Sequence, residues 1–172
     1  PVGGFVGLVD GSSTVSFNNC VFAGTIKAPT SQNVAGFVGQ TTSSVALSFN
    51  NCANYANITG AQAVAGFVGY TDSEMIFSNC VNNGNVTGKN HRVAGITGEA
   101  HVSKITIENC ANYGIIKTTN SAAQNIGGIV GYSQGKVDKC FNAGAIEGGS
   151  NIGGIIGRHQ NTSAVSNCFN LG

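Results

Sequence analysis

Three side chains in the middle of the chain carry the acid and base groups that an enzyme would need. Asp72, Glu99 and His101 recur near related positions of a repeating pattern, so stacked repeats would bring them close together. A carboxylate beside an imidazole can transfer protons as general base and acid. The alternative is a solvated polar face with incidental ion pairs. Because only seven acidic residues are spread over the whole chain, we favour that alternative and expect no catalytic residues and no enzyme activity.

Six cysteines are the other reactive side chains, and they follow one another at intervals of roughly 30 residues. They are Cys20, Cys52, Cys80, Cys110, Cys140 and Cys168. If equivalent residues stack about 4.8 Å apart, neighbouring thiols fall within disulfide range. The sequence allows a column of buried free thiols that act as small apolar groups, or the pairs Cys20–Cys52, Cys80–Cys110 and Cys140–Cys168. Stacked side chains point the same way, which favours free thiols.

Neither a metal nor a cofactor is expected. The chain has no Cys-x-x-Cys pair or Cys/His cluster, and no His-Glu-x-x-His, P-loop or Gly-x-Ser-x-Gly motif. Asn57, Asn85 and Asn161 each stand two residues before Thr or Ser, which makes them candidate acceptors for N-glycosylation. Two tyrosine pairs, Tyr70 with Tyr132 and Tyr55 with Tyr113, could stack on sugars or simply cover a sheet.

A repeat of six segments must position all of these residues. Each segment reads apolar, Gly or Ala, Gly, apolar, any residue, Gly, and each precedes one cysteine. The segments are Val2–Gly7, Val34–Gly39, Val64–Gly69, Val93–Gly98, Ile126–Gly131 and Ile152–Gly157. Asn stands two residues after every cysteine except Cys20, where Phe22 takes its place. Three patterns that recur in phase predict stacked copies of one structural unit.

The repeated unit is predicted to be strand. Apolar residues alternate before the cysteines, as in Leu47 and Phe49 or Ile105 and Ile107, which is the period of a β-strand. We expect residues 1–172 to form a single all-β domain, a parallel β-solenoid of about six coils with three short strands each, right-handed by default. Stacked asparagines, among them Asn19 and Asn109, are expected to adopt left-handed backbone geometry and to bond between coils.

The same phase aligns the polar residues in two columns, with Asp72 and His101 as neighbours in one and Glu99 in the other. The first column is Asp10, Thr42, Asp72, His101, Gln134 and Gln160, and the second includes Tyr70, Glu99, Tyr132 and Arg158.

These motifs resemble a known family. Gly36–Gly39, Gly66–Gly69 and Gly128–Gly131, with their counterparts in the other segments, are similar to the GLUG motif, Gly-Leu-any-Gly, with Phe or Ile in place of Leu. The phrase Asn82–Gly88 after the cysteine is also similar, and the resemblance covers the whole chain. It implies a repeat scaffold of secreted and surface proteins, such as adhesins, and it implies no catalytic residues.

Composition narrows the remaining functions. Charged residues make up 9% of the chain and the formal net charge is +1, which gives no reason to expect nucleic acid as a partner or insertion into a membrane. We expect an extracellular or cell-surface location and a structural or adhesive role. The alternatives are a subunit of an end-to-end stacked, glycosylated filament and a β-helix protein that binds or processes glycans. The partners would be a second copy, neighbouring repeats of a longer chain, or surface glycans.

Overall fold

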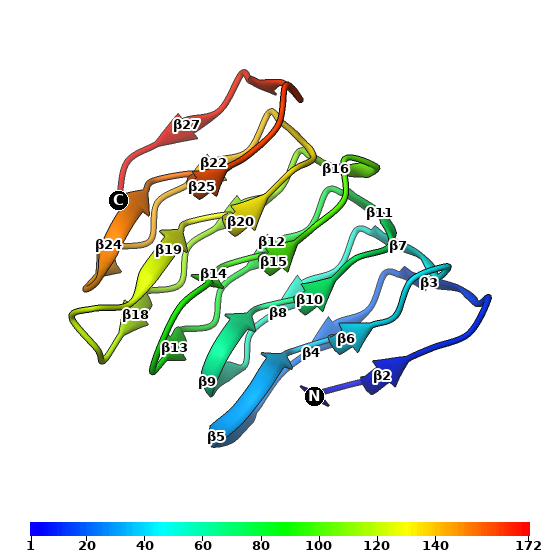
Figure 1. The fold of residues 1–172 in the computed structure, drawn as a ribbon, viewed down its shortest axis with the longest axis horizontal. Coiled ribbons are helices and arrows are strands. Elements are labelled where there is room, and N and C mark those ends of the chain that lie inside the picture. The colour runs from blue at the N-terminus through cyan, green and yellow to red at the C-terminus, as the bar shows by residue number, and fades with distance from the viewer.

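The computed structural model describes residues 1–172 and shows a parallel β-solenoid of about six turns of roughly 30 residues. All of its strand pairs are parallel, and they join each coil to the next from the blue N-terminal end to the red C-terminal end in Figure 1. The predicted fold class is therefore confirmed. No helix is long and apolar enough to cross a membrane.

The strands form four sheets, here called A to D, which run along the solenoid. Sheet A contains β1 (Val2–Gly3), β5 (Thr25–Ala35), β9 (Asn57–Ala65), β13 (Val86–Gly88), β14 (Val93–Ala94), β18 (Ile116–Thr118), β19 (Gln124–Gly127), β23 (Ile146–Glu147) and β24 (Ser150–Gly153). Sheet B contains β2 (Val6–Val9), β6 (Val38–Thr41), β10 (Val68–Thr71), β15 (Thr97–Ala100), β20 (Val130–Ser133) and β25 (Ile156–His159).

The other two sheets lie on either side of the cysteines. Sheet C, before them, contains β3 (Thr14–Asn18), β7 (Ala46–Asn50), β11 (Glu74–Ser78), β16 (Ile105–Glu108), β21 (Lys136–Asp138) and β26 (Val165–Ser166). Sheet D, after them, contains β4 (Val21–Phe22), β8 (Ala53–Asn54), β12 (Val81–Asn82), β17 (Ala111–Asn112), β22 (Phe141–Asn142) and β27 (Phe169–Asn170).

Three strands per coil are too few. The repeated motif, expected as one strand, is divided into two, for example β14 and β15. The strand expected through the Asn-x-Gly sequence after each cysteine is also broken in two. The break falls at the Asn-x-Gly sequence, where the asparagine side chain donates to the glycine carbonyl two residues on. Asn82 Nδ2 lies 2.8 Å from the carbonyl oxygen of Gly84, and Asn112 Nδ2 lies 2.9 Å from that of Gly114. The resulting turn separates sheet D from sheet A.

The corner between sheets C and D depends on residues with positive φ. Asn occupies this position in five coils, with φ between 51° and 57°, and Lys139 occupies it in the remaining coil with φ 51°. We call this the outer asparagine column: Asn19, Asn51, Asn79, Asn109 and Asn167. Asn tolerates the left-handed region better than most residues, which explains its recurrence immediately before each cysteine.

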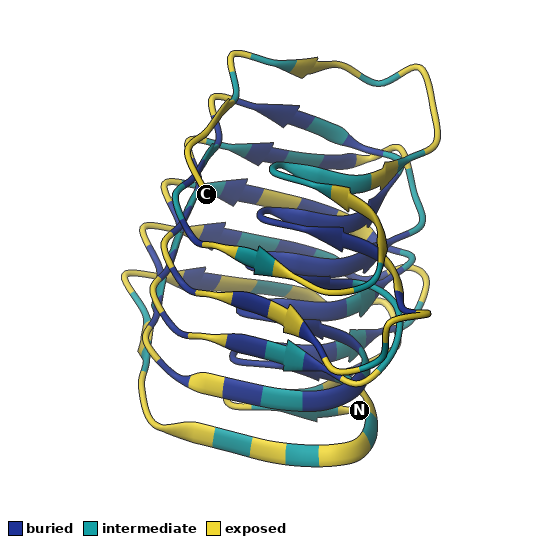
Figure 2. Cartoon of the chain, turned by 90° about the vertical axis from the view of Figure 1, so that its left-hand side faces the viewer, coloured by how far each residue is buried: buried dark blue, intermediate teal, exposed yellow.

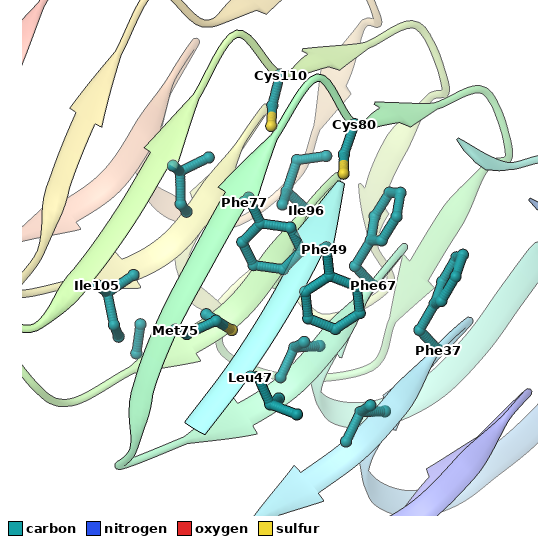
Figure 3. Packing of buried hydrophobic residues seen from close by; sticks show 14 of the residues in the cluster. Phe37, Leu47, Phe49, Phe67, Met75, Phe77, Cys80, Ile96, Ile105 and Cys110 are labelled. Carbon is teal, nitrogen blue, oxygen red and sulfur yellow. The ribbon is translucent and has the colours of Figure 1, made fainter. Parts of the chain in front are cut away.

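Two columns of phenylalanine fill the interior between sheets B and C. The Phe37 and Phe67 rings stack with centroids 4.6 Å apart, and the Phe49 and Phe77 rings stack at 4.4 Å. The two columns meet edge to face, for example between Phe37 and Phe49 at 5.8 Å. Figure 3 shows these rings together, and Figure 2 shows the buried inner positions alternating with exposed outer ones. Such offset and edge contacts suit the charge distribution of aromatic rings.

A column of asparagines lies beside the apolar interior, and its first four members are fully buried. We call it the inner asparagine column: Asn54, Asn82, Asn112, Asn142 and Asn170. In each step the Nδ2 group donates to the Oδ1 atom of the next coil at 2.7 Å. The bonding expected between the outer asparagines occurs once, where Asn51 donates to Asn19 at 2.7 Å, and their expected left-handed geometry is confirmed. The continuous series of asparagine bonds lies in the inner column, which the sequence did not predict.

The inner column explains the first glycine of each repeated motif. A Cβ atom on Gly95 would lie 2.5 Å from Oδ1 of Asn112 and 2.4 Å from the carbonyl oxygen of Gly128. Gly36 and Gly66 face Asn54 and Asn82 in the same way. The glycine before the Phe or Ile and the asparagine after the cysteine therefore recur together because each occupies the space beside the other.

Candidate functional site

The outer face of sheet B gathers the residues for which the sequence suggested chemistry. Strand pairing places Tyr70 beside Glu99, Glu99 beside Tyr132 and Tyr132 beside Arg158. The other predicted column, which includes Asp72 and His101, lies at the ends of these strands. It is also formed, because the backbone NH of His101 bonds to the carbonyl of Thr71, the residue before Asp72. Both alignments predicted from the repeat are confirmed.

Glu99 is the centre of this face, which we call the sheet B network. Its side chain is only 3% exposed, yet it has two partners. Arg92 Nη1 donates to Glu99 Oε2 at 2.8 Å, and His101 Nε2 contacts Glu99 Oε1. A buried carboxylate needs such partners, because burial without them would strongly disfavour its charged form. Arg92 was not predicted. The sequence does contain a sign of its special position. Arg92 stands one residue before the motif that begins at Val93, and Asn33 and Asn125 hold the same position in other coils, where they have positive φ.

Aromatic rings extend the network along the solenoid. The His101 ring lies 5.7 Å from Tyr70 and 4.8 Å from Tyr132, and the Arg158 guanidinium lies 5.7 Å from the Tyr132 ring centre. The Tyr132 hydroxyl donates to Gln160 at 2.7 Å and accepts from Gln134 at 3.0 Å. Tyr132 is only 6% exposed, so its ring is covered and does not offer a free surface for a sugar.

Asp72 does not complete an acid and base cluster. Its Oδ1 atom is buried and has no hydrogen-bond partner, and neither Glu99 nor His101 forms a hydrogen bond or ion pair with it. Asp72 instead lines a hollow of about 280 Å³ at the turn from sheet B to sheet C, beside Ser73, Glu74 and Lys104. Burial, with the nearby Asp72 and Glu99 carboxylates, raises the pKa of Tyr70, which therefore stays neutral at physiological pH. Of the three residues considered for acid and base chemistry, only Glu99 and His101 contact each other, and Arg92 binds the second oxygen of the Glu99 carboxylate.

The six cysteines lie one above another on the inside of the corner, and all six are free. None of the three adjacent pairs considered from the sequence is joined. Cys52, Cys80, Cys110 and Cys140 are buried, and Figure 3 shows the thiols of Cys80 and Cys110 near Phe77 and Ile96. Burial raises the pKa of Cys110 well above its ordinary value, so this thiol is neutral and a poor nucleophile. No group of three or more His, Cys, Asp or Glu side chains could hold a metal ion.

The three candidate glycosylation acceptors are all exposed. Asn57 and Asn85 occupy the same position in consecutive coils, where Asn57 begins β9 and Asn85 directly precedes β13, while Asn161 lies in the turn after β25. The backbone NH of Asn85 donates to Asn57 Oδ1 at 3.1 Å, and that of Ile115 donates to Asn85 Oδ1 at 2.9 Å. Their Oδ1 atoms therefore help to join the coils, and no hydrogen bond within the chain engages their Nδ2 groups.

Searches with this chain found no matching family model, no matching curated protein and no matching solved structure.

Proposed function

We propose that this chain is a structural repeat scaffold of an extracellular or cell-surface protein. One observation carries the proposal: every coil is bonded to the next through several parallel sheets and, from the second coil onward, also through the inner asparagine column. The chain has 107 backbone hydrogen bonds, and its asparagine amides bond coil to coil from Asn54 to Asn170. Such an assembly behaves as a stiff rod, because each repeat contacts only its neighbours and is held along its whole perimeter.

The character of the surface supports the same role. Charged groups are few, and all five ion pairs join residues of the same or adjacent coils, such as Lys117 with Glu147 at 2.8 Å. The motif Gly-apolar-x-Gly resembles the GLUG repeats of secreted and surface proteins, which supports an assignment to that family. We propose an adhesive or spacer role on this basis, with the sheet B network as a stabilising feature rather than a reaction centre.

The proposal is tested by locating the protein and measuring its shape. Antibodies against the purified chain should label intact source cells or their secreted matrix without permeabilisation. Small-angle X-ray scattering should show an elongated particle whose length increases when a copy of one internal coil is inserted. Labelling only after permeabilisation would contradict the surface role. A particle whose length does not change with the number of coils would contradict the rod.

A second proposal concerns the two ends of the solenoid. The first and last coils have strand edges without a partner in this chain, and they expose large apolar side chains such as Phe5 and Phe169. We propose that further coils of the same kind cover these edges, in neighbouring repeats or in a second copy stacked end to end. Electron microscopy of the purified chain at increasing concentration distinguishes the two, because only stacking copies form concentration-dependent filaments.

A further inference from the structure

Two exposed tyrosines lie at the corner between sheets D and A, in the second and fourth coils. Tyr55 is 56% exposed and Tyr113 is 53% exposed. Each follows a residue of the inner asparagine column, and the pentapeptide Asn-Cys-Ala-Asn-Tyr occurs at 51–55 and again at 109–113. Backbone bonds from Asn83 to Asn54 and from Tyr113 to Asn82 show that the two tyrosines occupy the same position, two coils apart.

The position alternates between large and small side chains along the rod. Its six occupants are Ala23, Tyr55, Asn83, Tyr113, Ala143 and Leu171, so the larger groups fall on even coils. The residue two positions earlier is small in the two tyrosine coils, where it is Ala53 or Ala111, and larger in the coil between them, where Val81 precedes Asn83. The Tyr113 ring meets Phe141 of the next coil edge to face, with ring centres 5.9 Å apart, yet both tyrosines remain more than half exposed beside these small alanines. Since coils are about 4.8 Å apart, the two rings are separated by about 10 Å along the solenoid axis.

Carboxamide groups lie between and beside the two rings. Asn83 is exposed in the coil between them, and Asn57 and Asn85 are exposed two residues further along the chain. The Oδ1 atoms of Asn57 and Asn85 are occupied by backbone NH groups, and no contact within the protein engages their Nδ2 groups. We call Tyr55, Asn57, Asn83, Asn85 and Tyr113 the tyrosine strip.

The strip carries no charge. The nearest charged column, on the neighbouring outward position of sheet A, holds Lys27 and Lys117, and Lys117 is paired with Glu147. Aromatic rings with free amide donors suit sugars, which have an apolar ring face and a hydroxyl rim. An uncharged polysaccharide matches this surface better than an acidic polymer or nucleic acid.

We propose that the tyrosine strip binds an uncharged, extended β-1,4-linked glycan lying along the solenoid axis. In such a chain every second sugar ring faces the same way, and the length of two sugars is close to the two-coil separation of the rings. Tyr55 and Tyr113 then stack on alternate sugars, while the Nδ2 groups of Asn57 and Asn85 donate to their hydroxyl groups. The inference rests on the scaffold function proposed above, because only a stiff rod holds the rings at a constant separation.

Calorimetric titration with defined oligosaccharides tests the strip. The protein is made in a host that attaches no N-glycans, since Asn57 and Asn85 are also candidate acceptors. We expect binding of cellohexaose or chitohexaose, much weaker binding of cellobiose, which is too short to reach both rings, and weak binding of maltohexaose, whose α-1,4 linkages curve the chain. Tyr55→Ala and Tyr113→Ala should each weaken binding about tenfold, equivalent to about 1.4 kcal/mol.

Two sets of control variants separate recognition from folding. Ile76→Ala removes another half-exposed apolar side chain from sheet C and should leave the affinity within twofold. Tyr55→Phe and Tyr113→Phe keep the ring and should retain most of the binding. The strip is overturned if neither β-1,4 hexasaccharide binds, if maltohexaose binds equally well, or if the double alanine variant binds like the unmodified protein. An elongated scattering profile in the same samples would show that the scaffold survives such a failure.

Discussion

The two asparagine columns are three residues apart in every coil, yet they contain the same residue type for different physical reasons. Inner Asn112 is fully buried, donates to Asn142 and to the carbonyl of Gly114, and accepts from Asn82. Outer Asn109 is exposed and has φ 53°. The inner column needs the amide, whereas the outer column needs the backbone conformation. Each column has one exception: Lys139 replaces Asn in the outer column, and apolar Phe22 stands in the inner position of the first coil.

Asn112→Asp should have the largest effect, because it places a carboxylate inside the inner column. The new group cannot donate to Asn142 Oδ1, and an uncompensated buried charge costs about 3–5 kcal/mol. Burial would raise its folded-state pKa above the unfolded value of about 3.9, so the full cost applies above the folded-state pKa. The cost should decrease as the pH falls toward about 4, since the protonated acid can donate. Urea unfolding at pH 7 and pH 4.5, relative to the unmodified protein, measures this difference.

A constant destabilisation at both pH values would show that shape, rather than hydrogen bonding, determines the residue at position 112. The isosteric change makes this a sharper experiment than a truncation, because Asp and Asn fill nearly the same volume beside Gly95.

Asn112→Ala should have the next largest effect. It removes the partner of Asn82 Nδ2, Asn142 Oδ1 and the Gly114 carbonyl, and each buried polar group left unpaired costs about 1–3 kcal/mol. Water entering the space would satisfy some of them, so we expect a total of about 3 kcal/mol. Chemical denaturation measures it, with Ala111→Gly on the neighbouring outward position as the reference. A loss below about 1 kcal/mol would mean that the column contributes little, by the same principle.

The outer column should respond to backbone conformation alone. Asn109→Val should cost about 1–2 kcal/mol, because a β-branched residue is strained at positive φ. Asn109→Gly should be nearly neutral, since glycine adopts this region freely. The two variants measured by thermal unfolding form a matched pair. If glycine were as destabilising as valine, the Asn109 side chain rather than its φ angle would be what the corner requires.

These corners also explain what the sequence could and could not predict. The 30-residue period predicts the coils and the vertical neighbours, including the pairing of Glu99 with Tyr132 on the outer face. It does not predict which way a side chain points beyond a corner. Ile107 and Cys110 both face inward although they are three residues apart, because the left-handed residue Asn109 shifts the strand alternation by one. Counting alternate residues therefore fails at this point and wrongly predicts an unbroken strand through the inner asparagines.

The sheet B network shows the same limit. Its columns follow from the period, but the contact of Arg92 with Glu99 spans the corner between sheets A and B. Arg92 has φ 66°, so its direction again depends on a left-handed residue that no apolar alternation reveals.

Lys139→Asn should have the smallest effect and is the most direct comparison within the outer column, because it restores the column's usual residue. Asn is better suited than Lys to φ 51°, which favours the variant. The variant also loses the ion pair of Lys139 with Glu108, and this hydrogen bond raises the pKa of Lys139. A raised lysine pKa means that the pair contributes stability below the unfolded pKa of about 10.4 and loses it as the pH rises through the folded value.

The two contributions therefore oppose each other at pH 7 and low salt, where we expect nearly equal melting temperatures for the variant and the unmodified protein. In 1 M NaCl the exposed ion pair is screened while the backbone preference is unchanged, so the variant should melt at the higher temperature. Differential scanning calorimetry at the two salt concentrations measures the change. If the variant melted at a lower temperature than the unmodified protein in high salt, a contact of Lys139 other than the ion pair with Glu108 would stabilise the protein. The preference for positive φ would then not determine stability at position 139, in contrast to the outer asparagines.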